Sequence, residues 1–171
     1  MRHIVTRKQF NAKMCFVCGL ENSSGLHARY YELDSRQVVA VIKPHDLHQS
    51  YPNRMHGGII TAILDETIGR AIMIEGDGAW GVTVEFNTRY RKPVPLDVEL
   101  RAVGRITKSA PRGFEGAGEL LLPDGAVAAE GFGRYMRVPL DRITDASEAD
   151  NWVVAREPDD PADFELPERG A

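Results

Sequence analysis

The chain has 171 residues, of which 43% are hydrophobic and 27% charged, and its formal net charge is −4 at pH 7. This composition is ordinary for one globular domain with a modest appendage, and it argues against a disordered chain. The sequence holds no apolar run near the roughly 18 residues of a membrane-spanning helix, and its start lacks the apolar centre of a signal peptide. We therefore expect a cytoplasmic protein with no membrane partner.

The charge is unevenly distributed along the chain. Residues 140–171 contain ten acids and three bases, a net charge of −7, so residues 1–139 carry +3. A mildly basic body suits a small molecule that bears phosphates, but it falls far short of the dense basic patch that nucleic-acid binding needs. We expect no nucleic-acid partner.

The first part of the chain predicts irregular structure followed by a hairpin. Residues 1–26 show no sustained period and contain several turn-forming residues, so we expect an irregular amino-terminal arm with one short helix. Residues 27–34 and 37–43 are rich in β-branched and aromatic side chains and are separated by Asp34-Ser35-Arg36, which predicts two paired strands. The polar loop that follows ends at His56-Gly57-Gly58, where a helix should begin.

The rest of the chain predicts one buried helix and four more strands. Apolar residues lie almost all round the axis between Ile59 and Glu75, which is typical of a helix buried on most sides. Strand patterns follow at 80–90, 96–106, 113–122 and 127–138. The predicted fold class is α+β, with the helix covering one face of an antiparallel sheet over residues 27–139. Residues 140–171 predict a partly ordered acidic tail in which only residues 151–154 could pack.

Two adjacent carboxylates lie inside this apolar helix. Burial of an unpaired carboxylate is costly and raises its pKa, so each one needs a reason to be there. Glu66 precedes Arg70 by four residues, and an ion pair at this spacing explains it structurally. The i−4 and i+4 neighbours of Asp65 are the small residues Thr61 and Gly69, which leave space beside the carboxylate. That space suggests a ligand, although a bond to a backbone amide or an interface contact would also explain Asp65.

The helix start offers a complementary group. Gly57 and Gly58 have no Cβ, so a ligand can approach the backbone N–H groups that point out of the first turn. Such donors stabilise a carbonyl oxygen that becomes an oxyanion during acyl transfer. A Gly-Gly pair is also an ordinary tight turn, and the hypothesis depends on its combination with Asp65 on the same helix.

The segment Met55-His56-Gly57-Gly58-Ile59-Ile60-Thr61-Ala62-Ile63-Leu64-Asp65-Glu66 resembles the signature of hotdog-fold acyl-CoA thioesterases of the phenylacetate-pathway (PaaI-like) group. The strand around Thr83, followed by Tyr90 and Pro93, is similar to the next strand of that family. Cys15-Phe16-Val17-Cys18-Gly19 is similar to the amino-terminal segment of one branch. The resemblance covers about residues 15–138 and implies a hotdog fold, a long central helix wrapped by a curved antiparallel sheet, in a homodimer or homotetramer.

The resemblance also assigns catalytic roles. Asp65 would act as the nucleophile or as a base toward water, and the amide of Gly57 or Gly58 would polarise the thioester carbonyl. Thr83 would come from the facing subunit to orient the water, and His56 would fix the turn and border the site. The expected substrate-binding residues are Ser50, Asn53, Thr61, Glu66, Arg89 and Arg91.

Two of these substrate contacts have a specific basis. Some family members supply a site Asn from the loop before the motif, whereas the aligned residue here is Ser50 and Asn53 lies elsewhere. Arg89 and Arg91 fall where the family tends to bind the nucleotide phosphates of CoA, although exposed bases on a strand edge also serve to limit edge pairing.

The only two cysteines, Cys15 and Cys18, are expected to be reduced packing residues of the arm. A structural zinc site uses four ligands, and the sequence has no second cysteine pair, so we expect neither a metal nor a cofactor other than the CoA of the substrate. The leading hypothesis is hydrolysis of an acyl-CoA thioester. A non-hydrolytic acyl-CoA binder or sensor of the same fold is the alternative, and a hydratase ranks last because its Asp and His pair is missing from the expected pattern.

Overall fold

The central helix forms where the sequence predicts it. The computed structural model describes residues 1–76, 78–145 and 151–168, and within them α1 spans Gly57–Gly69 and continues as a 3₁₀ segment, η2, over Arg70–Glu75. The buried side chains of α1 are Ile60, Ile63, Leu64, Thr67 and Ile68. Burial on this scale confirms the buried-helix interpretation. No helix in the described ranges has the length and apolar character to cross a membrane.

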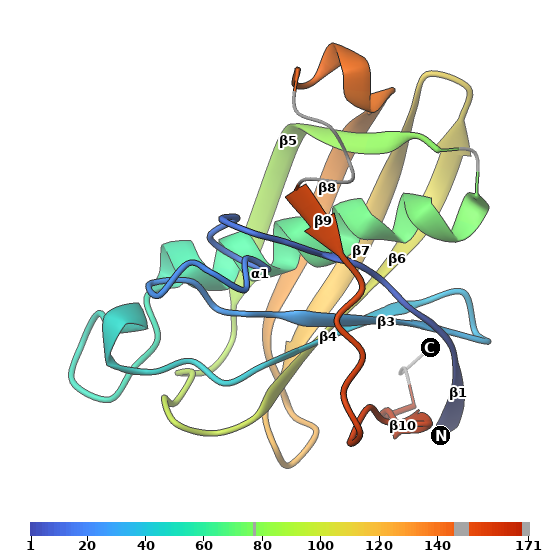
Figure 1. The fold of residues 1–171 in the computed structure, drawn as a ribbon. Helices are drawn as coiled ribbons and strands as arrows, with labels where there is room; N and C mark the ends of the chain where they lie inside the picture. The colour runs from blue at the N-terminus through green and yellow to red at the C-terminus, as the bar shows by residue number, and fades with distance from the viewer. Residues whose placement is uncertain (77, 146–150, 169–171) are drawn as a thin grey trace.

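One antiparallel sheet of eight strands wraps around α1 (Figure 1). Its strands, in spatial order, are β10 (Asp163–Glu165), β1 (Arg2–Lys8), β3 (Arg29–Leu33), β4 (Val38–Ile42), β6 (Leu100–Ala110), β7 (Gly113–Leu121), β8 (Val127–Val138) and β5 (Trp80–Tyr90). The helix packs against β4 to β8 and covers one face of the sheet. This arrangement is the predicted hotdog fold.

The two larger of the three hydrophobic clusters among the described residues lie on opposite faces of the sheet. The larger one joins α1 to the inner face and includes Tyr30, Leu64, Leu100 and Leu120. A smaller cluster, which includes Tyr31, Val103, Leu121 and Phe164, lies on the other side of the same strands. Alternate residues of a strand point to opposite faces, so neighbours such as Tyr30 and Tyr31 enter different clusters.

The prediction of an irregular amino-terminal arm was wrong for its first residues. Arg2–Lys8 forms β1, which pairs with β3 on one side and with β10 of the tail on the other. Ile4, Val5 and Thr6 favour a strand, but pairing to segments far away in the sequence decides it. The remaining arm residues contribute only the short β2 (Asn11–Ala12) and then pass over the outer side of α1 (Figure 1).

The acidic tail packs more extensively than predicted. Trp152 lies in β9 (Trp152–Val153), which pairs with β2, and its ring contacts Phe10 and Trp80 at centroid distances of 6.3 and 5.2 Å. The expectation that only residues 151–154 could pack was wrong, because Phe164 and Leu166 are also buried. This apolar pair lies among charged residues, so the composition of the tail does not reveal it. Residues 146–150 and 169–171 of the predicted tail lie outside the described residues.

The strand predicted at 96–106 is displaced toward the carboxyl end. Asp97 adopts a positive φ of 60°, and β6 therefore starts at Leu100 and runs to Ala110. Pro95 forms an isolated bridge with Arg54. Two short 3₁₀ segments, η1 (Asp46–His48) and η3 (Leu140–Arg142), complete the described structure.

Candidate active site

The first turn of α1 presents one free backbone donor. His56 is the N-cap, and its Nδ1 accepts a hydrogen bond from the Gly58 amide at 2.9 Å. The amide of Gly57 has no hydrogen-bond acceptor among the described residues. The structure therefore reduces the two glycine amides of the sequence prediction to one available donor, that of Gly57.

Gly57 is also held from the strand side. The hydroxyl of Tyr90 donates to its carbonyl at 2.8 Å, and a Cβ on Gly57 would lie 3.3 Å from that hydroxyl. The hydroxyl of Thr61 lies 2.9 Å from both Tyr90 Oη and Thr88 Oγ1. The predicted substrate contact Thr61 thus joins the helix to β5 near Gly57.

Asp65 lies two turns further along the same helix, and it has partners that the sequence did not reveal. The hydroxyl of Thr83 donates to its two carboxylate oxygens at 3.0 and 3.1 Å, and the hydroxyl of Tyr135 donates to Oδ1 at 3.1 Å. The sequence offers no charged partner for Asp65, and the two donors that the structure adds come from distant strands. Both partners are neutral hydroxyls, so they orient the carboxylate without cancelling its charge.

The electrostatic setting of Asp65 raises its affinity for a proton. Burial raises the pKa of Asp65, the hydroxyls of Thr83 and Tyr135 act in the opposite direction, and the neighbouring Glu66 adds to the rise. A carboxylate with a raised pKa is a stronger base than an exposed one, which suits attack on, or proton removal from, a nucleophile. The side chain remains partly exposed.

An irregularity in β5 aims the hydroxyl of Thr83 at the helix. Thr83 and Thr88 are an odd number of positions apart and would point to opposite faces of a regular strand. The register between β5 and β8 shifts between Thr83 and Glu85, and this bulge brings both hydroxyls to the α1 side. The resemblance implies a hydroxyl from the facing subunit, whereas here Thr83 contacts Asp65 of its own chain.

Sequence reasoning missed Tyr135. Its side chain is only 3% exposed, its ring stacks on Phe114 at 4.8 Å, and burial followed by the charge of Asp65 raises its pKa. A Cβ on Gly133 would lie 2.5 Å from the Tyr135 ring, so that glycine makes room for it. The pattern Gly131, Gly133, Tyr135 on one strand face was the available signal.

The other predicted contacts divide into groups near to and far from Asp65. Glu66 binds Arg70 Nε at 2.9 Å, as its i,i+4 spacing predicts, and belongs to a different cluster. Ser50 and Asn53 are exposed in the loop before α1, where the Ser50 amide donates to the carbonyl of Arg54 and the Asn53 amide donates to Gln49. Neither hydrogen-bonds to Asp65 in the described part of the chain.

Arg89, in β5, and Arg91, just after it, differ in their surroundings. Arg91 forms an ion pair with Glu130 at 2.7 Å. Arg89 is exposed and has no ion-pair partner among the described residues. Only Arg89 is therefore available to an incoming phosphate without the loss of an existing contact.

A large cavity formed by the described residues lies away from this site. It has a volume of about 1000 Å³ and is lined by residues that include Gln37, Val103, Leu121 and Leu166, but not Asp65. Asp65 and Thr83 instead face a surface at the β5 edge of the sheet.

Comparisons with known proteins identify relatives of this chain. Residues 53–129, which contain the helix start, Asp65 and Thr83, match the family model of the thioesterase superfamily. The acyl-coenzyme A thioesterase THEM4 of Rattus norvegicus is 32% identical over 91 residues, which cover 52% of this chain and 38% of that protein. The chain spans between 27% and 57% of the length of the curated relatives that it matches.

Solved structures of thioesterase superfamily proteins share the fold. The crystal structure of a thioesterase superfamily protein, RHA08564, has a TM-score of 0.66 and 27% identity, and covers 71% of this chain and 59% of that chain. A phenylacetic acid degradation-related protein from Ralstonia eutropha JMP134 has a TM-score of 0.59 and 21% identity, and covers 65% of this chain and 85% of its own. The fold, the matched motif and these relatives confirm the predicted resemblance: the chain is similar to members of the thioesterase superfamily.

Proposed function

We propose that the protein hydrolyses an acyl-CoA thioester, with Asp65 as the reacting carboxylate. The observation that supports this most directly is the half-buried Asp65 carboxylate, which two hydroxyl donors orient. Asp65 lies on the same helix as the free Gly57 amide. The similarity to THEM4, an acyl-coenzyme A thioesterase, favours a CoA ester as the substrate class.

The spacing along α1 supports a site shared by two subunits. Gly57 and Asp65 are eight residues apart, which corresponds to roughly 12 Å at 1.5 Å per residue. A nucleophile and an oxyanion donor must both lie about 3 Å from the reacting carbonyl group, so the two groups of one chain cannot serve the same thioester. A second copy that brings its own Gly57 amide to Asp65 solves this problem, in a homodimer or a dimer of dimers.

The β5 edge offers the surface for that second copy. β5 is the last strand of the sheet, so one row of its backbone groups has no partner strand (Figure 1). Val82, Val84, Phe132 and Met136 on β5 and β8 are exposed large hydrophobic residues. Unpaired edges and exposed apolar groups favour association, and antiparallel pairing of two β5 strands would place two α1 helices side by side.

The chemistry follows from the geometry. The thioester oxygen accepts the Gly57 amide of one subunit, which polarises the carbonyl and stabilises the developing oxyanion. Asp65 of the other subunit either attacks the carbonyl carbon or removes a proton from the attacking water, while Thr83 and Tyr135 hold its carboxylate. A C–O bond forms, the C–S bond breaks, and CoA leaves as the thiolate. If Asp65 itself attacks, water then cleaves the mixed anhydride, which releases the free acid and restores the carboxylate. Arg89 would attract the nucleotide phosphates.

Release of free thiol from a panel of acyl-CoA esters tests this function. For an ester that the protein accepts, Asp65→Asn should lower kcat by roughly 10²-fold or more, the usual contribution of a positioned acid or base. Asp34→Asn, in the distant β3–β4 turn, is the control. Tight binding of the panel without thiol release would instead support the non-hydrolytic acyl-CoA binder, and unchanged turnover by Asp65→Asn would remove that residue from the mechanism.

A further inference from the structure

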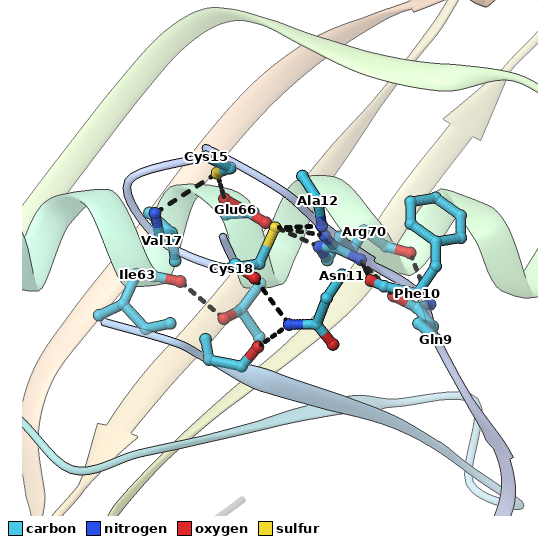
Figure 2. Close-up of polar contacts among 12 residues, drawn as sticks. Gln9, Phe10, Asn11, Ala12, Cys15, Val17, Cys18, Ile63, Glu66 and Arg70 are labelled. Carbon is cyan, nitrogen blue, oxygen red and sulfur yellow. Dashed lines mark hydrogen bonds and ion pairs between the residues drawn. The ribbon is translucent and has the colours of Figure 1, made fainter. Parts of the chain in front are cut away.

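The arm and the central helix together form a cluster of metal-ligating atoms. Cys15 Sγ, Cys18 Sγ and a carboxylate oxygen of Glu66 lie within 4.8 Å of one another, and the Cys15 to Glu66 distance is 3.2 Å (Figure 2). Glu66 belongs to α1, so the third ligand atom comes from an element 48 residues away from Cys18 in the sequence. The sequence argument against a metal considered the two cysteines and did not consider Glu66 as a ligand.

The spacing of these atoms is close to that in the coordination shell of a zinc ion. With Zn–S bonds near 2.3 Å and Zn–O bonds near 2.1 Å, neighbouring ligands of a tetrahedral site lie roughly 3.4–3.8 Å apart. Thiolates select soft or borderline ions, and two thiolates with one carboxylate suit Zn²⁺ better than Mg²⁺ or Ca²⁺. The observed cluster needs only small adjustments to reach this geometry.

Backbone groups hold the two sulfur atoms in place before any metal arrives. The amide of Val17 donates to Cys15 Sγ and the amide of Ala12 donates to Cys18 Sγ, each at 3.4 Å. The amide of Gly19 donates to the carbonyl of Cys15 at 2.8 Å, and a Cβ at Gly19 would lie only 2.3 Å from that oxygen. The turn therefore requires the glycine of Cys-x-x-Cys-Gly, and the two N–H donors fix the positions of the sulfur atoms.

Asn11 fixes the same turn from below. Its side-chain amide donates to the carbonyls of Cys18 and Ala28 at 2.7 and 2.8 Å, and the residue is fully buried (Figure 2). The turn is thereby attached to the start of β3, so both cysteines have a fixed position relative to α1. A ligand set of fixed geometry loses little freedom on binding, which favours affinity.

The buried Arg70 balances the charge of such a site. Its Nε binds Glu66 at 2.9 Å, one of its terminal nitrogens lies 3.1 Å from Cys18 Sγ, and the other donates to the carbonyl of Phe10 at 2.9 Å. Two thiolates and one carboxylate carry three negative charges, which a divalent ion and one guanidinium together neutralise. Buried charge is tolerated only when it is compensated in this way.

We infer that Cys15, Cys18 and Glu66 form a zinc site that fastens the amino-terminal arm to α1, with Arg70 as the compensating cation. Cys15 and Glu66 are partly exposed, so a water molecule can occupy the fourth position. Disulfide formation between the cysteines explains the cluster less well, because it would remove the thiol donor from Glu66 and leave that carboxylate and Arg70 with weaker partners.

Metal binding by the full chain, purified with its thiols reduced, tests the inference without reference to hydrolysis. The stripped protein should bind one equivalent of Zn²⁺ in competition with a chromophoric chelator and release protons as it does so. Co²⁺ in place of Zn²⁺ should give thiolate charge-transfer bands and the intense visible bands of a tetrahedral site. The melting temperature should fall when the metal is removed.

Two variants and a matched control assign the ligands. Cys15→Ser should lower Zn²⁺ affinity by at least ~100-fold and weaken the charge-transfer bands, and Glu66→Gln should lower affinity by roughly 10–100-fold. Glu119→Gln is the control, since Glu119 also pairs with an arginine and its side chain is 23% exposed, against 21% for Glu66. That variant should bind Zn²⁺ like the wild type.

The same measurements can overturn the inference. Reduced wild-type protein that binds neither Zn²⁺ nor Co²⁺ would exclude the site, whether or not mild oxidation by a disulfide reagent then joins Cys15 to Cys18. Undiminished affinity in Cys15→Ser would show that metal binds elsewhere. Equal losses in Glu66→Gln and Glu119→Gln would remove Glu66 from the ligand set.

Discussion

Thr83 and Tyr135 lie directly opposite each other on β5 and β8, and both donate hydrogen bonds to the carboxylate of Asp65. A cross-strand pair thus holds one side chain of the helix that crosses the sheet. Because one donor comes from each strand, the carboxylate is fixed in direction as well as in position. Its contribution to catalysis should depend on both hydroxyls.

Removal of either hydroxyl should slow the reaction without abolishing it. We expect Thr83→Val and Tyr135→Phe each to lower kcat about tenfold, the scale of one hydrogen bond to a charged group. The fall in kcat of the double variant should be smaller than the product of the two single falls, since both groups act on one carboxylate. Tyr31→Phe, which removes a buried hydroxyl bonded to Asp160, should leave kcat unchanged. Strict additivity of the two losses would contradict a shared role.

A charge on the β5 edge should separate the subunits and, at the same time, inactivate the protein. Val84 is 59% exposed on this edge, and Val84→Lys places an ammonium group in the proposed interface. Light scattering should show a shift from dimer or tetramer to monomer, with a parallel loss of thiol release. Val153→Lys, on a residue that is 51% exposed in β9, is the control. A fully active monomer would contradict the shared site.

Arg89 should affect the nucleotide part of the substrate alone. Because its guanidinium has no ion-pair partner among the described residues, Arg89→Ala should raise KM for acyl-CoA roughly threefold to fivefold, as expected for one exposed charge pair. KM for the matching acyl-pantetheine, which lacks the nucleotide, should stay constant. Arg91→Ala, which removes a residue already paired with Glu130, should have a smaller effect. Equal changes with both substrates would contradict phosphate binding.

The stability of the loop before α1 should depend on the protonation of His48. The ring is fully buried, its Nδ1 accepts from the His45 amide, and its Nε2 lies 3.1 Å from the carbonyl of Ser24. Burial lowers the pKa of His48, and the nearby His45 lowers it further. As the pH falls through about 6.5, the unfolded chain takes up a proton that folded His48 does not, so the free energy of unfolding decreases.

Urea unfolding between pH 5 and 8 would measure this loss. His48→Gln should flatten the pH dependence of the free energy of unfolding, and His27→Gln, on an exposed residue, should retain it. A slope that is the same in His48→Gln and in the wild type would assign the effect to other groups.

Phe164 should stabilise the fold although it lies in the acidic tail. Its side chain is 3% exposed, and its ring lies 5.5 Å from that of Tyr31. Phe164→Ala should lower the free energy of unfolding by about 3 kcal/mol, the lower end for a buried phenylalanine. Val154→Ala, on a tail residue that is 45% exposed, should change it by under about 0.5 kcal/mol. Similar values for the two variants would show that the tail is not part of the cooperative fold.

The sequence by itself determined the elements whose signal is local. An apolar pattern all round the axis predicted the buried helix with Asp65 inside it, and strand patterns predicted the four strands between residues 80 and 138. The i,i+4 spacing predicted the Glu66–Arg70 pair. Each of these depends on neighbours within a few residues, so periodicity and spacing contain the necessary information.

Only the tertiary structure decided which distant groups meet. The strand β1 exists because the backbone groups of β3 and β10 pair with it, and no local pattern in residues 2–8 required that. Tyr135 and Thr83 reach Asp65 through strand register and a bulge, and Glu66 joins Cys15 and Cys18 because the arm folds back over α1. These contacts span from 18 to 70 residues of sequence, and packing rather than propensity selects them.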